Sequence, residues 1–217
     1  MLQAQNLRCV RGERQLFSDL GFTLDAGELL YLQGKNGAGK TSLLRMLVGL
    51  LPPAGGEILW KGRPIGRQAE EYRAELCYLG HHNGTKEDLT PLENLLTSAR
   101  LAGEALSEDD AVDALEQVGL AGREDIACKY LSQGQKRRVA LARLVKKRCA
   151  LWILDEPFVA LDTAAVGWLT ELIGGHLQRG GLCVMTTHQP VAISAGAVRE
   201  QWIGARPAPG GAGMAQC

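Results

Sequence analysis

The sequence has no long apolar run and no excess of charge of either sign. No stretch approaches the ~18 consecutive apolar residues of a membrane-spanning helix, so we expect any membrane association to come through a partner. The 24 basic and 24 acidic residues cancel, and this balance argues against a protein that binds nucleic acid by bulk charge. The hydrophobic fraction of 46% is ordinary for a soluble globular chain.

Motifs built from cysteine pairs are also missing. The six cysteines are scattered, without CxxC or Cys/His spacing, and the N-terminus lacks the basic-then-apolar run of a signal peptide. We therefore expect reduced thiols in a cytoplasmic protein, rather than a disulfide framework or a structural metal site. Glycine, in contrast, accounts for 27 of 217 residues, well above the usual ~7%. This abundance predicts many tight turns.

Short strand-like segments open the chain. Residues 2–7 and 15–24 alternate around a polar turn, as in an antiparallel hairpin at a sheet edge. Residues 29–33 predict a buried strand, followed by a glycine-rich loop and an amphipathic helix over 41–50. Two further short strands are expected, over 57–61 and 74–79.

The character of the sequence changes between residues 89 and about 130. Thr90 is a capping residue with Pro91 at the first helical position and an acid in the first turn, so we expect a helix to begin there. Ser107 begins a second helix, which ends at Gly119. We expect these helices to form a small lobe inserted into a sheet domain.

Helices and strands alternate again after this lobe. A helix with a basic face is expected over 133–147, then a fully apolar strand over 150–154. Another helix over 166–178 leads into a strand over 182–186. This alternation predicts an α/β architecture with ligands at the carboxyl ends of the strands.

A phosphate-binding loop lies between the first predicted buried strand and the helix that follows it. Eight consecutive residues fit the pattern GxxxxGK[ST] in full: Gly34, Lys35, Asn36, Gly37, Ala38, Gly39, Lys40 and Thr41. Glycines allow backbone N–H groups to converge on phosphate oxygens, and the helix adds its positive end. We expect Lys40 to bind the β and γ phosphates of ATP, Thr41 to ligate Mg²⁺ through its hydroxyl, and Ser42 to belong to the same ATP-binding segment.

Two acids follow the apolar strand over 150–154. Asp155 and Glu156 therefore lie at the carboxyl edge of the sheet, where the phosphate loop also opens. We expect Asp155 to hold Mg²⁺ through water, and Glu156 to orient and polarise the attacking water as general base. This pair and the loop together predict an ATPase.

The segment Leu131, Ser132, Gln133, Gly134 and Gln135 resembles the signature sequence of ABC-family ATPases, which usually have glycine where Gln133 stands. In that family the segment begins a helix and closes over the γ-phosphate held by a second subunit. The resemblance implies a homodimer with composite ATP sites, in which Ser132 and the backbone of Gly134 are donors. It also implies a P-loop NTPase fold, with a RecA-like parallel sheet, an N-terminal antiparallel β subdomain and the inserted helical lobe.

Other positions of the family pattern follow in order along the chain. Asp162 lies in a segment similar to the loop that signals across the dimer, and His188 matches the switch histidine that contacts the γ-phosphate. Where family members stack an aromatic ring on adenine, this chain offers Arg11, whose guanidinium can stack instead. The glutamine that usually ends the strand before the lobe is replaced by His81 or by His82, and either imidazole can reach magnesium or water.

Several motifs together resemble the ATP-binding subunits of bacterial cytochrome c maturation systems, the haem exporter ATPases. These motifs are GKTSLLR at 39–45, YLGH at 78–81, WILDEPF at 152–158 and TTHQ at 186–189. The resemblance implies a peripheral position at the cytoplasmic face of the inner membrane, with integral membrane permease subunits as partners. We expect the ATPase domain to span residues 1–205, followed by a disordered tail over 206–217.

Three other functions share parts of this pattern. The ATPase motifs do not specify cargo, so the chain can also belong to a transporter for another substrate. A soluble ABC protein that acts on ribosomes or DNA usually has two ATPase halves or a long coiled coil, and this sequence has neither. A non-hydrolysing module is disfavoured because the chain has both Glu156 and the signature segment, and degenerate sites typically lose one of the two.

Overall fold

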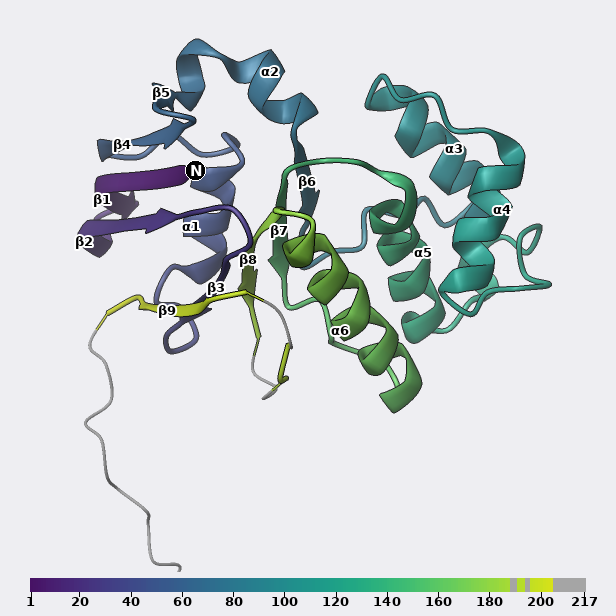
Figure 1. Ribbon diagram of the computed structural model, residues 1–217. Coiled ribbons are helices and arrows are strands. Elements are labelled where there is room, and N and C mark those ends of the chain that lie inside the picture. Colours follow the sequence, from purple (N-terminus) through teal and green to yellow (C-terminus); the bar gives the residue numbers. More distant parts are fainter. Residues whose placement is uncertain (188–190, 194–195, 205–217) are drawn as a thin grey trace, which may run out of the picture.

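The structure of the chain, a computed structural model, describes residues 1–187, 191–193 and 196–204. Two β-sheets lie side by side with helices between and beyond them, and a separate pair of helices forms a lobe at one end (Figure 1). The expected tail over 206–217 and the expected switch residue His188 lie outside the described residues.

The N-terminal sheet has four antiparallel strands. Its order is β2 (Arg14–Leu24), β1 (Leu2–Arg11), β4 (Gly55–Trp60) and β5 (Arg63–Pro64). The predicted hairpin is therefore present, and its first strand is longer than expected because the pairing with β2 continues to Arg11. This sheet is the antiparallel β subdomain that the resemblance implied.

The second sheet has five parallel strands, which are buried on both faces at its centre. Its order is β6 (Leu76–Leu79), β7 (Leu151–Asp155), β8 (Leu182–Thr186), β3 (Leu29–Gln33) and β9 (Val198–Trp202). All of its pairings are parallel. The edge strand β9 was not predicted, because its sequence VREQW is polar and largely exposed.

Helix α1 (Lys40–Leu47) packs between the two sheets. Its leucines share one core with the inward faces of both sheets, and Tyr72 closes that core beside Trp60. Tyr72 belongs to a short helix, α2 (Ala69–Ala74). The strand predicted over 74–79 was therefore wrong at its start, because Ala74 ends a helix of good helix formers and pairing begins at Leu76.

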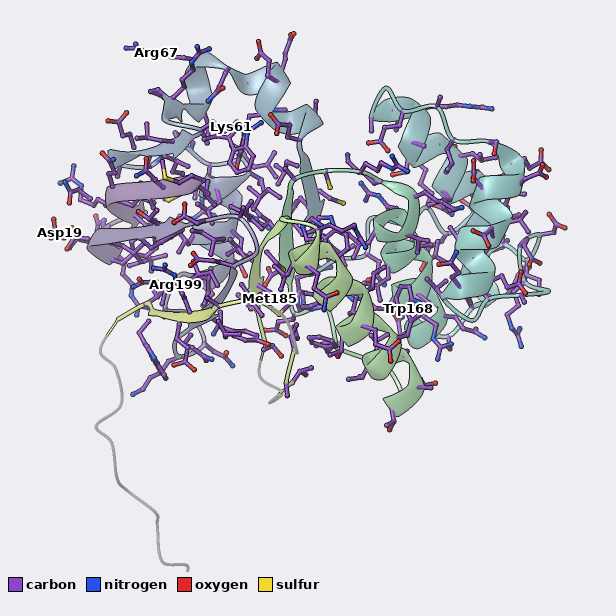
Figure 2. All side chains as sticks on the ribbon, viewed as in Figure 1. Asp19, Lys61, Arg67, Trp168, Met185 and Arg199 are labelled. Atoms are coloured by element: carbon purple, nitrogen blue, oxygen red, sulfur yellow. The ribbon has the colours of Figure 1, made fainter. Side chains whose placement is uncertain are left out.

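The opposite face of the parallel sheet is covered by α5 (Gln133–Lys146) and α6 (Thr163–Gln178). The lobe consists of α3 (Pro91–Leu101) and α4 (Glu108–Gln117), which pack against α5. Trp168 of α6, labelled in Figure 2, contacts both the core under the sheet and the core of the lobe. Because α5 contributes to both cores, it joins the lobe to the sheet.

Side-chain caps fix where the lobe helices begin. Thr90 forms a capping box with Glu93 at the start of α3, and the Ser107 hydroxyl accepts the Asp110 N–H at the start of α4. Asn94 lies 9% exposed on α3 and binds the backbone of Lys86 through both its amide oxygen and its amide nitrogen. The lobe is thereby fastened to the segment that connects it to β6.

The membrane prediction concerns helix length and polarity. Of the helices in the described part of the chain, none has the length and apolar character needed to span a bilayer.

Candidate active site

The phosphate loop connects the end of β3 to the start of α1, as the motif predicted. Gly39 has φ 112°, a conformation that favours glycine, and a Cβ there would lie in tight contact, 3.1 Å from the Phe17 ring. Lys40 turns back over the loop, where its Nζ donates to the carbonyl of Gly34 at 2.6 Å and to that of Lys35 at 3.4 Å. The ammonium group is thus held at the mouth of the loop.

A chain of hydrogen bonds joins the loop to the carboxyl ends of β7 and β8. Thr41 Oγ1 donates to Asp155 Oδ2 at 3.0 Å, across 114 residues of sequence. The other carboxylate oxygen, Oδ1, accepts from Thr186 Oγ1 at 2.7 Å, and the same hydroxyl accepts the Glu156 N–H at 2.9 Å. Asp155 is 2% exposed. A buried hydroxyl–carboxylate network of this kind holds its side chains in one geometry.

Arg137 belongs to α5, the helix for which the sequence predicted a basic face, and its side chain is buried. It is 4% exposed and donates to the carbonyls of Asp155 at 3.0 Å and Glu156 at 2.8 Å. Burial lowers the pKa of Arg137 to about 10, against the opposing effect of the Asp155 and Glu156 carboxylates. The guanidinium is therefore protonated at neutral pH. Lys136 beside it is also buried, at 8% exposed, so two basic residues of this helix face the interior.

The signature segment begins α5. The Ser132 hydroxyl accepts the Gln135 N–H at 3.2 Å, and the Gln135 side chain accepts the Ser132 N–H at 2.9 Å. A Cβ on Gly134 would lie 2.7 Å from the carbonyl oxygen of Ala160, so this glycine permits close contact with the segment that precedes α6. Leu131 is buried and Gln133 is exposed.

Asp162 links that preceding segment to the signature helix. Its Oδ1 caps α6 by accepting the Ala165 N–H at 2.9 Å, and its Oδ2 binds Arg138 Nη2 at 2.5 Å. One cavity of about 330 Å³ is lined by Ser132, Gly134 and Asp162 together. The predicted signalling residue and the predicted signature therefore form one surface.

A second cavity, of about 610 Å³, opens over the phosphate loop. Lys40, Thr41 and Glu156 line it, and so do Arg11 and His81. His82 lies outside this lining and faces a neighbouring cavity, although its ring is 5.5 Å from that of His81 in an edge-on arrangement. His81 therefore lines both cavities, and His82 lines only the neighbouring one. The remaining predicted loop residues that line the cavity are Lys35, Asn36, Gly37, Gly39 and Ser42.

Sequence reasoning missed two residues of this network. Thr186 gives no signal in the sequence, because its contact with Asp155 depends on the register of β7 and β8. Arg137 gives one: with Leu141 and Leu144 it has the i, i+4, i+7 spacing of a buried helix face. In the described part of the chain, no three or more His, Cys, Asp and Glu side chains gather as a metal cluster.

The family model for ABC transporters matches residues 17–159 of the chain. The cytochrome c biogenesis ATP-binding export protein CcmA of Dechloromonas aromatica is 73% identical over 204 residues, which cover 94% of this chain and 100% of that protein. The protein with the same name from Escherichia coli K12 is 49% identical over 200 residues, which cover 92% of this chain and 95% of that protein.

Solved structures show the same fold. The structure of the ATP-binding subunit of an ABC transporter, 29% identical, has a TM-score of 0.76 and covers 86% of this chain and 79% of its own. A dimeric ATP-binding cassette in a post-hydrolysis state, 22% identical, has a TM-score of 0.77 with 87% and 88% covered. The predicted P-loop NTPase fold of the ABC type is thus confirmed, and the chain belongs to the ABC transporter family, in the group of the cytochrome c biogenesis ATP-binding export proteins.

Proposed function

We propose that the chain binds ATP with Mg²⁺ and hydrolyses it to ADP and phosphate to drive a membrane-embedded exporter of cytochrome c biogenesis. The observation that carries the proposal is the 3.0 Å contact between Thr41 of the phosphate loop and Asp155 at the end of β7. This contact brings the two motifs of an ATPase, 114 residues apart, to one sheet edge. The similarity to CcmA proteins supports the biological setting.

The phosphate loop is assigned to the nucleotide. Backbone N–H groups of residues 34–41 and the positive end of α1 bind the phosphates, and Lys40 neutralises the β and γ oxygens. Arg11 lines the same cavity and is assigned to the adenine face, where its planar guanidinium can stack.

The donor set at the sheet edge fits Mg²⁺. The Thr41 hydroxyl would ligate the ion, and the Asp155 carboxylate, 3.0 Å from that hydroxyl, would hold the ion through water. Hard oxygen groups of this kind are what Mg²⁺ prefers. When bound with ATP, the ion supplies charge neutralisation on the phosphate oxygens. Thr186 keeps one Asp155 oxygen occupied, so the other oxygen points to the loop.

Glu156 is assigned as the general base, and His188 as the residue that contacts the γ-phosphate. Glu156 lines the cavity above the phosphate loop, and its carboxylate is assigned to orient a water molecule there for attack. Asp155 precedes it by one residue, so binding of the cation and activation of water come from one turn at the end of β7.

The signature segment is assigned to the ATP site of a second copy of the chain. Within one chain, Ser132 and Gly134 line a cavity separate from that of the phosphate loop. Donors at the start of α5 suit a phosphate bound from outside the chain. Two copies arranged head to tail would complete two sites, and Asp162 would report closure because it binds the signature helix through Arg138.

The membrane partner is assigned to the helical lobe, over residues 89 to about 130, together with the segment of His81 and His82, and the localisation to the cytoplasmic face of the inner membrane. His81 and His82 line a cavity of about 620 Å³ together with Tyr78 and Arg45. Thr41 of the phosphate loop also lines this cavity. A partner that contacts the cavity would therefore lie next to the residues assigned to bind ATP.

Hydrolysis is tested with Lys40→Ala. We expect wild-type protein to release phosphate from ATP in Mg²⁺, and the variant to lose at least ~100-fold in kcat/KM because the charge on the γ-phosphate is no longer neutralised. Phosphate release by the variant at the wild-type rate would contradict the assignment of the loop.

The biological setting is tested by co-purification. An N-terminally tagged chain is isolated from native membranes in mild detergent, and its partners are identified by mass spectrometry. Recovery of cytochrome c maturation membrane subunits supports the proposal. Recovery of a different permease would be consistent with an ATPase of a transporter but would contradict the role in cytochrome c biogenesis. Recovery of ribosomal proteins alone would contradict a role in transport.

A further inference from the structure

We propose that Arg137 is a positioning residue for hydrolysis, which fixes the backbone of Glu156 and ties it to the loop that leads to the lobe. The proposal rests on the assignment of Glu156 as the general base. It goes beyond that assignment because it names the side chain that sets the direction of the base.

The guanidinium of Arg137 has every donor occupied. Its five N–H groups have five acceptors: the carbonyls of Pro157 at 3.3 Å, Gly80 at 3.2 Å, Asp155 at 3.0 Å and Glu156 at 2.8 Å, and Asn83 Oδ1 at 3.1 Å. Three of the five are consecutive carbonyls of the turn that carries the base. Only a planar fork of five donors satisfies such a set, and a lysine has three donors on one atom.

The Glu156 backbone needs support because it is in a conformation that side chains rarely adopt. Its φ is 49°, in the left-handed region that is unfavourable for residues with a Cβ. The Thr186 hydroxyl accepts its N–H at 2.9 Å, and Arg137 Nη2 binds its carbonyl at 2.8 Å. With both polar groups of the residue held, the direction of its Cα–Cβ bond is set.

The same guanidinium connects this turn to the segment between β6 and the lobe. Gly80 and Asn83 flank the two histidines of that segment. Lys136, the preceding residue of α5, binds Glu87 further along the segment at 2.7 Å. The signature helix therefore holds the segment at two points. A displacement of the segment would reach the Glu156 carbonyl through a single side chain.

The experiment measures steady-state ATP hydrolysis, which gives kcat and KM, for the 217-residue chain and its variants Arg137→Met and Arg137→Lys. We expect kcat to fall about 100-fold in Arg137→Met, as for a catalytic group displaced by about 1 Å, while KM stays within about threefold. In Arg137→Lys, kcat should fall by at least about 10-fold. The positive charge remains, but a lysine cannot make most of the hydrogen bonds that the guanidinium makes.

The matched control separates positioning from general destabilisation. Tyr72→Phe removes a buried hydrogen bond to the Leu47 carbonyl, of 2.6 Å, in the core between the sheets and away from the catalytic turn. We expect this variant to lower the melting temperature and leave kcat unchanged. A third variant, Asn83→Ala, removes one acceptor on a surface loop and should reduce kcat by a few-fold.

The outcomes are distinct. A folded Arg137→Lys or Arg137→Met protein with wild-type kcat overturns the proposal, and so does a fall in kcat that Tyr72→Phe reproduces at equal loss of melting temperature. If Arg137→Met does not fold, Arg137→Lys and Asn83→Ala give the same decision. Failure of the proposed function would give a different result: wild-type protein would hydrolyse no ATP, or Glu156→Gln would hydrolyse it at the wild-type rate.

Discussion

Single hydroxyl groups order the catalytic edge of this protein. Thr186 donates to Asp155 and accepts from the Glu156 N–H, so it serves both acids at once. Thr170 provides a contrast, because its hydroxyl bonds locally to the Val166 carbonyl, at 2.7 Å, on α6. Thr186 therefore links two acidic residues of the site, whereas Thr170 bonds only within its own helix. Valine has the same shape as threonine without the hydroxyl, so it can replace either residue.

We predict that Thr186→Val lowers kcat by at least about 10-fold and destabilises the protein by about 1–3 kcal/mol, because it leaves a buried carboxylate oxygen and a backbone N–H without a partner. Steady-state hydrolysis and urea unfolding measure the two effects. Thr170→Val is the control, and it should change neither by much. Equal activities of the two variants would contradict the role of Thr186.

The residues of the site differ in how far the sequence reveals them. A contiguous motif identifies the phosphate loop, since eight neighbouring residues must all fit. The contact of Asp155 with Thr186 depends on strand register, and register between parallel strands that are distant in sequence leaves no local pattern. Arg137 was not singled out from the sequence, because a charged residue is seldom buried, although its spacing with Leu141 and Leu144 indicated the buried face.

At the scale of elements, the sequence predicted helices and strands best where capping residues or apolar runs mark them. The helices that begin at Thr90 and Ser107 have caps that the sequence displays, and both begin where expected. The strand predicted over 182–186 is present with those bounds as β8. Edge strand β9 and short helix α2 were missed, because each buries few of its side chains and so has little hydrophobic periodicity.

The junction of α6 and β8 contains a buried titratable group. His176 stacks on Trp152 with ring centroids 4.0 Å apart, and its Nε2 lies 3.1 Å from the Leu182 carbonyl oxygen. Burial, opposed by that hydrogen bond, lowers the pKa of His176 to about 4. Because the pKa is about 6.5 in an unfolded chain, the unfolded state binds more protons between these two values.

We predict that the free energy of unfolding falls by up to about 3 kcal/mol as the pH drops from 6.5 to 4, and that this contribution is fully present above pH 6.5. His176→Phe keeps an aromatic ring against Trp152 and removes the titration, so its stability should depend less on pH over this interval. Urea unfolding at several pH values provides the measurement. Parallel profiles for the two proteins would show that another group is responsible.

At the scale of the whole molecule, the phosphate loop and the signature segment, which we assign to the two halves of one ATP site, line different cavities. The phosphate loop and Glu156 line one cavity, and Ser132 and Gly134 line another. The exposed Tyr130 and Val159, which flank the second surface in sequence, are 75% and 47% exposed. A second copy that covers this surface would bury them and bring donors to the bound nucleotide.

The most direct test of the account is the mass of Glu156→Gln in solution, by light scattering, with and without ATP and Mg²⁺. The substitution should stop hydrolysis and leave ATP in place, so we predict twice the 23.4 kDa chain mass in ATP and the mass of one chain without it. Adding Lys40→Ala should abolish the dimer. A variant that binds ATP and keeps the mass of one chain would contradict composite sites shared between two copies.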